Sequence, residues 1–407
     1  MSDYLFIDRQ HQLDLALTSL ASVDCMGIDT ESSGYYTYFS ELCLIQISAG
    51  DQHYIIDTLA GLNLDGLGPL FADPGITKIF HAAASDIAEL KRDLKFDFVN
   101  VFDTMIACRM LGHDSCSLLS LVKHYKGIDL EKKEQKSNWK KRPLTRSQLD
   151  YANLDTVFLE ELMRTMSAEL AELNLSEEIQ EEFEWIASHT GQSGDDAGER
   201  DFDPNGWLRI RGAVDLPPKQ RAVVKALYEI RDQRARKENL AAFRLVTNDG
   251  LLRILRKKPK SVRDLEQLRA INPVMLRKDG ERLLEALQTT AEITDDHLPK
   301  PAVEDNPELR ALVRRLKRWR SRVAEYRGMD PSMIVTNKAL FKLADVKPRD
   351  LSELEGLQLL TDWKARNYGE HLLGIVHGTY NGELPENLPR LPADVREARE
   401  AKTGARS

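Results

Sequence analysis

The sequence of 407 residues contains no long hydrophobic run. No segment approaches the roughly 20 apolar residues that a membrane-spanning helix requires, so we expect no membrane span. The N-terminal residues 1–5 also lack the basic patch and apolar stretch of a secretory signal. The sequence therefore predicts a cytoplasmic protein, and its composition of 42% hydrophobic and 30% charged residues is typical of a globular one.

Cysteine is scarce, and its four residues all lie in the first third of the chain. Cys25, Cys43, Cys108 and Cys116 do not show the paired spacing of a zinc site. Cys25 and Cys43 also lie in apolar runs that resemble strands. We predict that all four are buried, reduced thiols rather than disulfide partners or zinc ligands.

Positive charge is in deficit overall, since the formal net charge is −8. The distribution along the chain changes the interpretation. Residues 1–170 carry 16 Lys and Arg against 25 Asp and Glu, whereas residues 216–290 carry 18 against 9 and residues 306–380 carry 14 against 9. Two basic modules therefore follow an acidic one, which indicates that the C-terminal half captures a polyanion.

The first half has the pattern of an α/β domain, and the chain length suggests two or three domains. Apolar runs predict strands, and helical spacing follows them. Thr145 and Gln148 form a capping box at the start of the last helix. The expected strands are 25–29, 42–48, 53–57 and 76–80, and the expected helices are 85–94, 103–111, 117–125 and 145–170.

An internal repeat with an offset of 89 residues occupies the second half and runs without gaps over about forty residues. Apolar positions at helical spacing are preserved, with proline and glycine between them, so each copy is expected to be a small helical bundle. Matching pairs include Thr247 with Thr336, Pro259 with Pro348, Gly280 with Gly369, and Leu283 with Leu372. Segments rich in glycine, proline and charge separate the parts.

Four acidic residues and a tyrosine, in three short stretches, carry the chemistry. Asp29 and Glu31 are two residues apart, which on a strand points both side chains to one side. Tyr151 and Asp155 are four apart, which on a helix stacks them on one face. Asp86 comes at the start of a predicted helix, where an anion is favoured. Each element alone is common as a solvated turn, a surface pair or a helix cap, but carboxylates gathered in one cleft require a compensating cation.

In this order, the three stretches resemble the exonuclease motifs of the DEDD superfamily, in its tyrosine-bearing subclass. The run Leu42-Cys43-Leu44-Ile45-Gln46-Ile47 and the segment 101–104 are similar to ribonuclease D proteins, and the repeat resembles two copies of the helicase-and-RNase-D C-terminal (HRDC) module. The resemblance covers residues 5 to about 380. It implies an RNase H-like 3′–5′ exonuclease domain, with a mixed sheet flanked by helices, followed by two all-α HRDC bundles.

By this resemblance, Asp29, Glu31, Asp86 and Asp155 would hold two divalent cations, Mg²⁺ or Mn²⁺. Hard oxygen ligands without Cys or His neighbours select the same ions. The cations would activate a water and stabilise the leaving 3′ oxygen, with Tyr151 orienting that water or accepting its proton. Ser32 stands where ribonuclease D proteins commonly have a bulky apolar residue, which leaves the preference for the terminal nucleotide open.

Several other residues are expected to contact the substrate. Thr30 lies between two of the acids, and His81 either approaches the phosphate or is a structural, hydrogen-bonded histidine. In the basic segment 130–146, Lys140 would contact phosphate while Trp139 either packs against the domain or stacks on a base. The last three candidates, Arg256, Lys257 and Lys258, either stabilise a helix end or hold RNA phosphates with little base recognition.

The function predicted is a metal-dependent 3′–5′ exoribonuclease that acts as a monomer on RNA such as tRNA precursors and releases nucleoside 5′-monophosphates. A DNA exonuclease and a non-catalytic nucleic-acid-binding adaptor are the alternatives. The domains expected are 1–190 for the nuclease, 213–293 and 307–381 for the HRDC modules, 191–212 and 294–306 for linkers, and 382–407 for a flexible tail.

Overall fold

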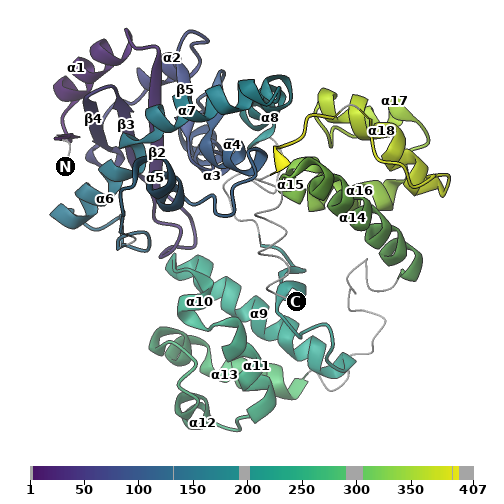
Figure 1. Cartoon of the computed structure of the whole chain (residues 1–407). Coiled ribbons are helices and arrows are strands. Elements are labelled where there is room, and N and C mark those ends of the chain that lie inside the picture. The colour runs from purple at the N-terminus through teal and green to yellow at the C-terminus, as the bar shows by residue number, and fades with distance from the viewer. Residues whose placement is uncertain (1–2, 132, 192–201, 290–305, 387, 394–407) are drawn as a thin grey trace. The chain divides into compact units, whose positions relative to one another are not determined.

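The structure is a computed structural model that describes residues 3–131, 133–191, 202–289, 306–386 and 388–393. The chain divides into two compact units, shown in Figure 1. The first comprises Met1–Glu31, Leu42–Ala197 and Glu308–Ser407, and the second comprises Ser32–Glu41 and Gly198–Pro307. The loop that follows Glu31 therefore belongs to the unit that contains the first helical module.

The first unit is built on a six-stranded mixed sheet with the order β1-β4-β3-β2-β5-β6. Strand β4 pairs in parallel with β1 and antiparallel with β3, while β5 pairs in parallel with both β2 and β6. Strand β3 is buried along its whole length, as expected for an interior strand. The strands are β1 (Leu5–Ile7), β2 (Cys25–Ser32), β3 (Leu42–Ala49), β4 (Gln52–Asp57), β5 (Thr77–Phe80) and β6 (Val101–Asp103).

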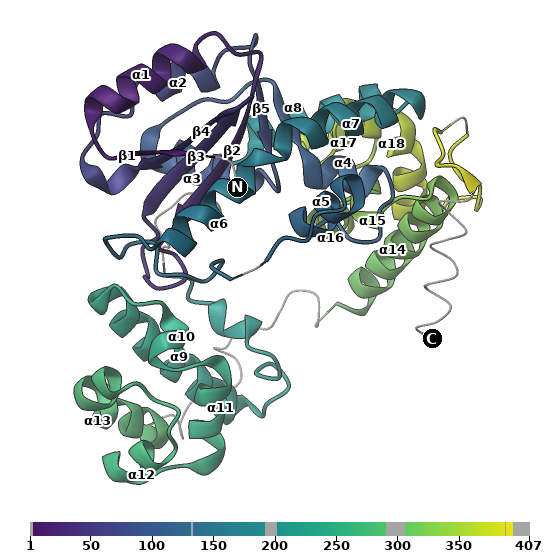
Figure 2. The ribbon, with the colours of Figure 1, turned by 60° about the vertical axis from the view of Figure 1, so that its left-hand side comes forward.

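Helices cover the sheet, as Figures 1 and 2 show. One apolar cluster joins strand residues to α1, α2 and α3, and a separate cluster joins β3 and β4 to α6. The sheet is therefore buried by helices through both sets of alternating side chains. The helices of this part are α1 (Gln10–Leu20), α2 (Leu67–Phe71), α3 (Ala84–Leu94), α4 (Thr104–Met110), α5 (Leu118–Lys126), α6 (Arg146–Val157), α7 (Leu159–Glu172) and α8 (Ser176–His189), with a 3₁₀ turn η1 (Thr58–Ala60).

The α/β class and the four predicted strands are confirmed, within a residue or a few at their ends. The single helix predicted over 145–170 is wrong, because the chain forms α6 and α7 with an interruption at Phe158. Apolar spacing continues across this residue, so periodicity does not reveal the break. The capping box at the start of α6 is present: the Gln148 backbone N–H donates to the Thr145 hydroxyl, and the Thr145 backbone N–H donates to the Gln148 side chain.

The repeat appears as two sets of five helices, and each helix of the second set begins 89 residues after its counterpart. Thr247 and Thr336 cap equivalent helices, and Lys258 and Lys347 end them in the left-handed conformation. The first set is α9 (Pro218–Glu238), α10 (Ala242–Leu245), α11 (Asn248–Lys257), α12 (Val262–Gln267) and α13 (Pro273–Thr289), preceded by η2 (Gly206–Arg209). The second set is α14 (Pro307–Arg327), α15 (Pro331–Ile334), α16 (Asn337–Val346), α17 (Leu351–Gly356) and α18 (Asp362–His377).

The second helical module packs on α8 of the nuclease domain, within the same unit. The Arg327 guanidinium, which is fully buried, donates to both carboxylate oxygens of Glu178 at 2.8 and 2.6 Å. It also donates to the Tyr368 hydroxyl at 2.6 Å and lies 5.1 Å from the centre of the Trp363 ring. Lys364 adds an ion pair with Glu182 at 2.7 Å. An acidic face of α8 is thus neutralised by cations of the second module.

The described part of the C-terminal tail is ordered by the same arginine. The Arg327 Nε–H donates to the carbonyl of Pro389, and the Leu391 backbone N–H donates to the carbonyl of Arg327. Leu388 and Leu391 are buried. Residues 388–393, within the stretch 382–407 that was expected to be a flexible tail, are thus held by these contacts, whereas 394–407, residues 192–201 of the first predicted linker and residues 294–305 of the second lie outside the described residues. Within the described ranges no helix is long and apolar enough to cross a membrane.

Candidate active site

Strand β2 supplies the first two carboxylates, Asp29 and Glu31, which point to one side because the strand alternates. Gly27 on the same strand permits a close approach of the helices that cover it. A Cβ atom at this position would lie 2.9 Å from the carbonyl oxygen of Thr156 and 3.1 Å from the Cβ of Leu159. Gly27 was not among the predicted site residues, although a glycine inside an apolar strand run is a signal for such an approach.

Asp86 lies in the first turn of α3 and is buried, at 8% exposure. The backbone N–H and the hydroxyl of Thr30 both donate to its Oδ1 atom, at 3.1 and 2.5 Å. Thr30 therefore fixes the Asp86 carboxylate against β2. Thr30, between Asp29 and Glu31, thus has a structural role that does not depend on the substrate contact expected for it.

Helix α6 brings the remaining two candidates, Tyr151 and Asp155, one turn apart on the same face. Carboxylate oxygens of Asp29, Glu31 and Asp155 all lie within 4.8 Å of one another. The Tyr151 hydroxyl forms a hydrogen bond with Asp155. Residues from three distant stretches of sequence thus meet at one place.

The carboxylates of this cluster repel one another, and burial adds to the cost of their negative charges. Burial raises the pKa of Asp29 well above its usual range, and the charges of Asp86, Asp155 and Glu31 raise it further. Burial and the neighbouring acids act on Glu31 in the same direction. For both Asp86 and Asp155, burial raises the pKa to about 7, although hydrogen bonds from Thr30 and Tyr151 oppose the shift.

A divalent cation fits this cluster. Among the described residues, none of the four carboxylates forms an ion pair with Lys, Arg or His. Buried acids without a counter-charge are costly, and an ion with oxygen ligands removes that cost. The residues present therefore match the donor set of hard cations.

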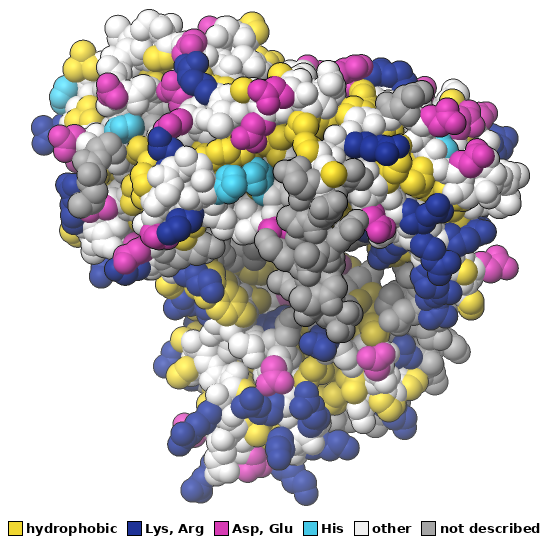
Figure 3. Space-filling view, viewed as in Figure 1, with side chains coloured by type: hydrophobic (Ala, Val, Ile, Leu, Met, Phe, Trp, Pro, Cys, Tyr) yellow, Lys and Arg dark blue, Asp and Glu magenta, His cyan; other side chains and the backbone are white. Residues whose placement is uncertain are grey.

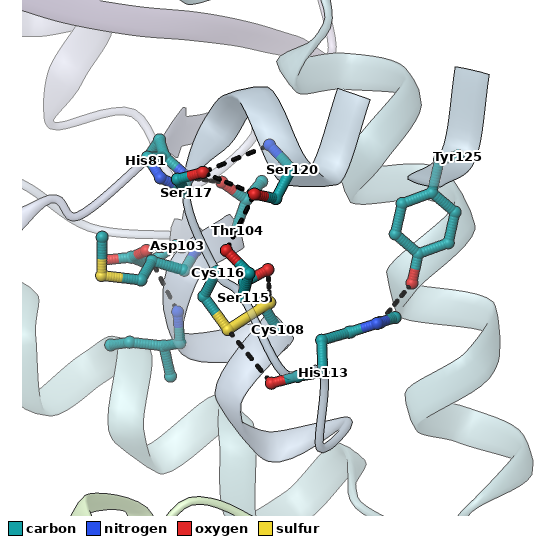
Figure 4. The surroundings of a disulfide bond; sticks show 12 residues. His81, Asp103, Thr104, Cys108, His113, Ser115, Cys116, Ser117, Ser120 and Tyr125 are labelled. Carbon is teal, nitrogen blue, oxygen red and sulfur yellow. Dashed lines mark hydrogen bonds between the residues drawn. A yellow bond between two sulfur atoms is a disulfide. The ribbon is translucent and has the colours of Figure 1, made fainter. Parts of the chain in front are cut away.

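The turn before α3 is held by Asp103, the N-cap of α4 (Figure 4). Its carboxylate accepts hydrogen bonds from the backbone N–H groups of Ala82 and Ala83, at 3.0 and 2.8 Å, and of Met105 at 2.8 Å. His81 lies beside it, with Nδ1 2.9 Å from the Thr104 hydroxyl. Asp103 thus supports the segment that carries Asp86, and His81 has the structural hydrogen bond that was one of its two expected roles.

The prediction of four reduced thiols is wrong for one pair. Cys108, on α4, and Cys116, in the loop before α5, form a disulfide (Figure 4). Cys25 and Cys43 are buried and do not take part in a disulfide, as predicted. The error arises because the bridge joins a helix to the loop that returns to it, and the spacing of eight residues does not reveal that the two side chains face each other.

The basic segment before α6 differs from expectation at Trp139. Its side chain is only 2% exposed and packs in the cluster that contains Cys43, Leu44, Ile55 and Ala152. The indole ring lies 6.1 Å from the Tyr151 ring. Packing against the domain is therefore the correct alternative, and the ring is not available to stack on a base. Lys140 is exposed, as a phosphate contact requires.

The basic candidates of the first module lie at the end of α11. Arg256 and Lys257 occupy its last turn, Lys258 is its C-cap, and all three are exposed. In the second module Arg315, Arg318 and Arg322 line a cavity of about 240 Å³ together with Trp319. Figure 3 shows Lys and Arg side chains gathered on the visible face of the first module and along α14 of the second. Both roles considered for these cations, helix-end stabilisation and phosphate binding, are compatible with their positions.

Comparison with known families assigns each part of the chain. Residues 4–171 match the 3′–5′ exonuclease family, which covers the sheet and all four clustered acids. Residues 220–287 and 310–376 each match the HRDC domain family, so the two repeat copies are HRDC modules.

Ribonuclease D proteins match this chain along most of their own length. The chain is 29% identical over 383 residues to ribonuclease D of Acidiphilium cryptum, covering 92% of this chain and 93% of that protein. It is 29% identical to ribonuclease D of Pseudomonas paraeruginosa, over 86% of this chain and 92% of the relative. The crystal structure of Escherichia coli RNase D, at 23% identity, has the same fold, with a TM-score of 0.66 over 92% of this chain and 99% of that one. The chain therefore belongs to the ribonuclease D family, and it is a 3′–5′ exoribonuclease of the metal-dependent DEDD superfamily.

Proposed function

We propose that Asp29, Glu31, Asp86 and Asp155 hold two divalent cations, Mg²⁺ or Mn²⁺, at which the last phosphodiester bond of an RNA strand is hydrolysed. The observation that supports this most strongly is the meeting of these carboxylates without a cationic side chain among the described residues. Such ions, when bound, would lower the pKa of the attacking water and stabilise the leaving 3′ oxygen. The products would be a shortened RNA and a nucleoside 5′-monophosphate.

Tyr151 would orient the attacking water in this scheme. Burial raises the pKa of its hydroxyl, and the charges of Asp155, Glu31 and Asp29 raise it further. The phenol therefore stays protonated near neutral pH and acts as a hydrogen-bond donor and acceptor rather than as a base in its own right. Its bond to Asp155 and its packing against Trp139 fix its direction.

Replacing Tyr151 by Phe removes only this hydroxyl. We expect Tyr151→Phe to lower the rate of nucleotide release by about a hundredfold, while the affinity for RNA changes little. Single-turnover kinetics, with binding measured separately in EDTA, would separate the two effects. Tyr125→Phe is the matched control, because the Tyr125 hydroxyl bonds Glu169 and His113 and touches none of the four acids. An unchanged rate for Tyr151→Phe would contradict the assigned role.

The substrate we propose is structured RNA such as tRNA precursors. E. coli RNase D, whose fold this chain shares, is an exoribonuclease involved in structured RNA processing. The exposed cations of the HRDC modules, including Arg256, Lys257 and Lys258, support capture of RNA phosphates outside the nuclease domain. DNA remains the alternative polymer, because hydrolysis at two metal ions serves either polymer and discrimination requires a contact with the 2′-hydroxyl. A cytoplasmic location and a monomeric state stay predictions.

The deciding experiment follows matched RNA and DNA strands labelled at the 5′ end, together with a tRNA precursor carrying a 3′ extension. We expect a ladder that shortens from the 3′ end of RNA in Mg²⁺ or Mn²⁺, none in EDTA, and nucleoside 5′-monophosphates as products. Faster degradation of DNA than of RNA would contradict the proposed substrate. Removal of the extension from the precursor, with the mature end spared, would support a role in tRNA processing.

A further inference from the structure

Two exposed aromatic rings lie together in the second unit. Among the described residues only seven large hydrophobic side chains are exposed, and two of them are aromatic: Tyr35, at 43%, and Phe243, at 45%. Their ring centres are 5.3 Å apart, with 56° between the planes. Exposed apolar residues that occur singly are ordinary, whereas these two rings are in contact, and surface rings of this kind are what nucleic-acid bases stack on.

The pair is held in place by the surrounding structure. Tyr35 lies in the loop 32–41, and Phe243 lies on α10 of the first HRDC module. The Ala241 backbone N–H donates to the carbonyl of Tyr36 at 3.1 Å, and the Phe39 N–H donates to the Asn239 side chain at 3.0 Å. The buried Tyr38 hydroxyl donates to Asp232 at 2.9 Å. These bonds join the loop to α9 and α10 beside the two rings.

Two arginines lie over two other rings of the same loop, Tyr36 and Phe39. The Arg244 guanidinium lies 4.5 Å from the centre of the Tyr36 ring, and that of Arg236 lies 5.6 Å from the Phe39 ring. Both arginines are exposed. Exposed rings with exposed arginines on neighbouring rings match a single nucleic-acid strand, whose bases stack on rings while its phosphates meet cations.

We propose that Tyr35 and Phe243 form a stacking platform for bases of single-stranded RNA, with Arg244 and Arg236 holding the adjoining phosphates. The proposal rests on the RNA-degrading function and adds to it a binding site outside the nuclease fold. The platform begins four residues after Glu31 in the sequence. Its rings take the role that Trp139, which is buried, does not fill.

The platform is specific to the first module. In the repeat, Phe243 and Arg244 correspond to Ser332 and Met333 of α15, at the same offset of 89 residues. The second module therefore lacks both the ring and the cation at these positions. Recognition of bases by stacking is assigned to one copy only.

The test measures binding of single-stranded RNA in EDTA, where no turnover occurs, to the full-length protein. We expect Tyr35→Ala and Phe243→Ala each to weaken binding by about tenfold. Phe243→Tyr, which keeps a ring, should bind as the wild type does. Leu15→Ala removes an even more exposed apolar side chain, on α1, and should also have no effect.

An abasic scan distinguishes stacking from a general loss of structure. Removing one base at a time should weaken wild-type binding at particular positions of the strand, and Phe243→Ala should abolish this sensitivity at those positions. Equal losses on normal and abasic strands, or unchanged binding by both alanine variants, would overturn the platform. If the wild-type protein degrades RNA in Mn²⁺ while these variants bind normally, only the platform fails; if the wild type degrades no RNA, the proposed function itself fails.

Discussion

Asp29→Asn should abolish RNA degradation while the protein stays folded. The substitution keeps the size of the side chain but removes one of the charges that would hold the cations. We expect nucleotide release in Mg²⁺ or Mn²⁺ to fall by on the order of a thousandfold or more. Asp155→Asn should behave in the same way. Isothermal titration with Mn²⁺ alone, without RNA, should show that both variants lose metal affinity.

The same substitutions should stabilise the metal-free protein. The four carboxylates repel one another in a partly buried site, so removing one charge relieves that repulsion. In EDTA the melting temperature of Asp155→Asn should rise by a few degrees, whereas added Mn²⁺ should stabilise the wild type more than the variant. Asp150→Asn is the control on the same helix, because Asp150 pairs with Arg146 and Tyr4 and takes no part in the cluster. Metal-dependent activity in Asp29→Asn, or a drop in apo stability, would contradict the assignment.

Arg327→Met should strongly destabilise the contact between the second HRDC module and the nuclease domain. Arg327 and Glu178 are fully buried, with 0% and 1% of their side chains exposed. Loss of the arginine leaves the Glu178 carboxylate buried without a partner, which costs about 3–5 kcal/mol. Urea unfolding followed by tryptophan fluorescence should report this loss, since Trp319 and Trp363 both contact Tyr368 beside the pair.

Two further variants separate the buried charge from the interface as a whole. Arg366→Ala removes an ion pair from the same interface, with Glu177 and Glu181, but its side chain is 54% exposed. This change should cost less than about 1 kcal/mol. Replacing both partners, as Arg327→Met with Glu178→Leu, should recover most of the stability. An effect of Arg327→Met no larger than that of Arg366→Ala would show that the buried pair does not hold the module.

Local periodicity predicted the pairs within the acidic cluster, whereas the resemblance to the DEDD exonuclease motifs implied that the three stretches meet in one site. The alternation of β2 aligns Asp29 with Glu31, and the helical turn aligns Tyr151 with Asp155. The repeat was equally visible, since capping residues and apolar spacing recur at one offset. The paired acids and the capping residues are thus recognised from patterns that each span only a few residues.

Contacts that depend on how the folded chain brings its segments together were not predicted from the sequence. The role of Gly27 depends on how α6 packs against the sheet, and the same packing decides between the two alternatives that the sequence left open for Trp139. The disulfide depends on the path of the loop between Cys108 and Cys116, and the pairing of Arg327 with Glu178 joins residues 149 apart. Composition and spacing contain no direct record of such contacts. The break at Phe158 was missed for a different reason, because the pattern of apolar residues continues through it.

The two HRDC modules share one pattern of helices, yet the side chains at equivalent positions differ, so the modules are not interchangeable. Arg327 and Tyr368 of the second copy correspond to Glu238 and Asp279 of the first, which pair instead with Arg234 of their own module. A first copy transplanted into the second position would present Glu238 to Glu178, acid against acid. Each module therefore fits only its own position in the chain. Recombination between the repeats would be selected against, even though the backbone pattern is the same.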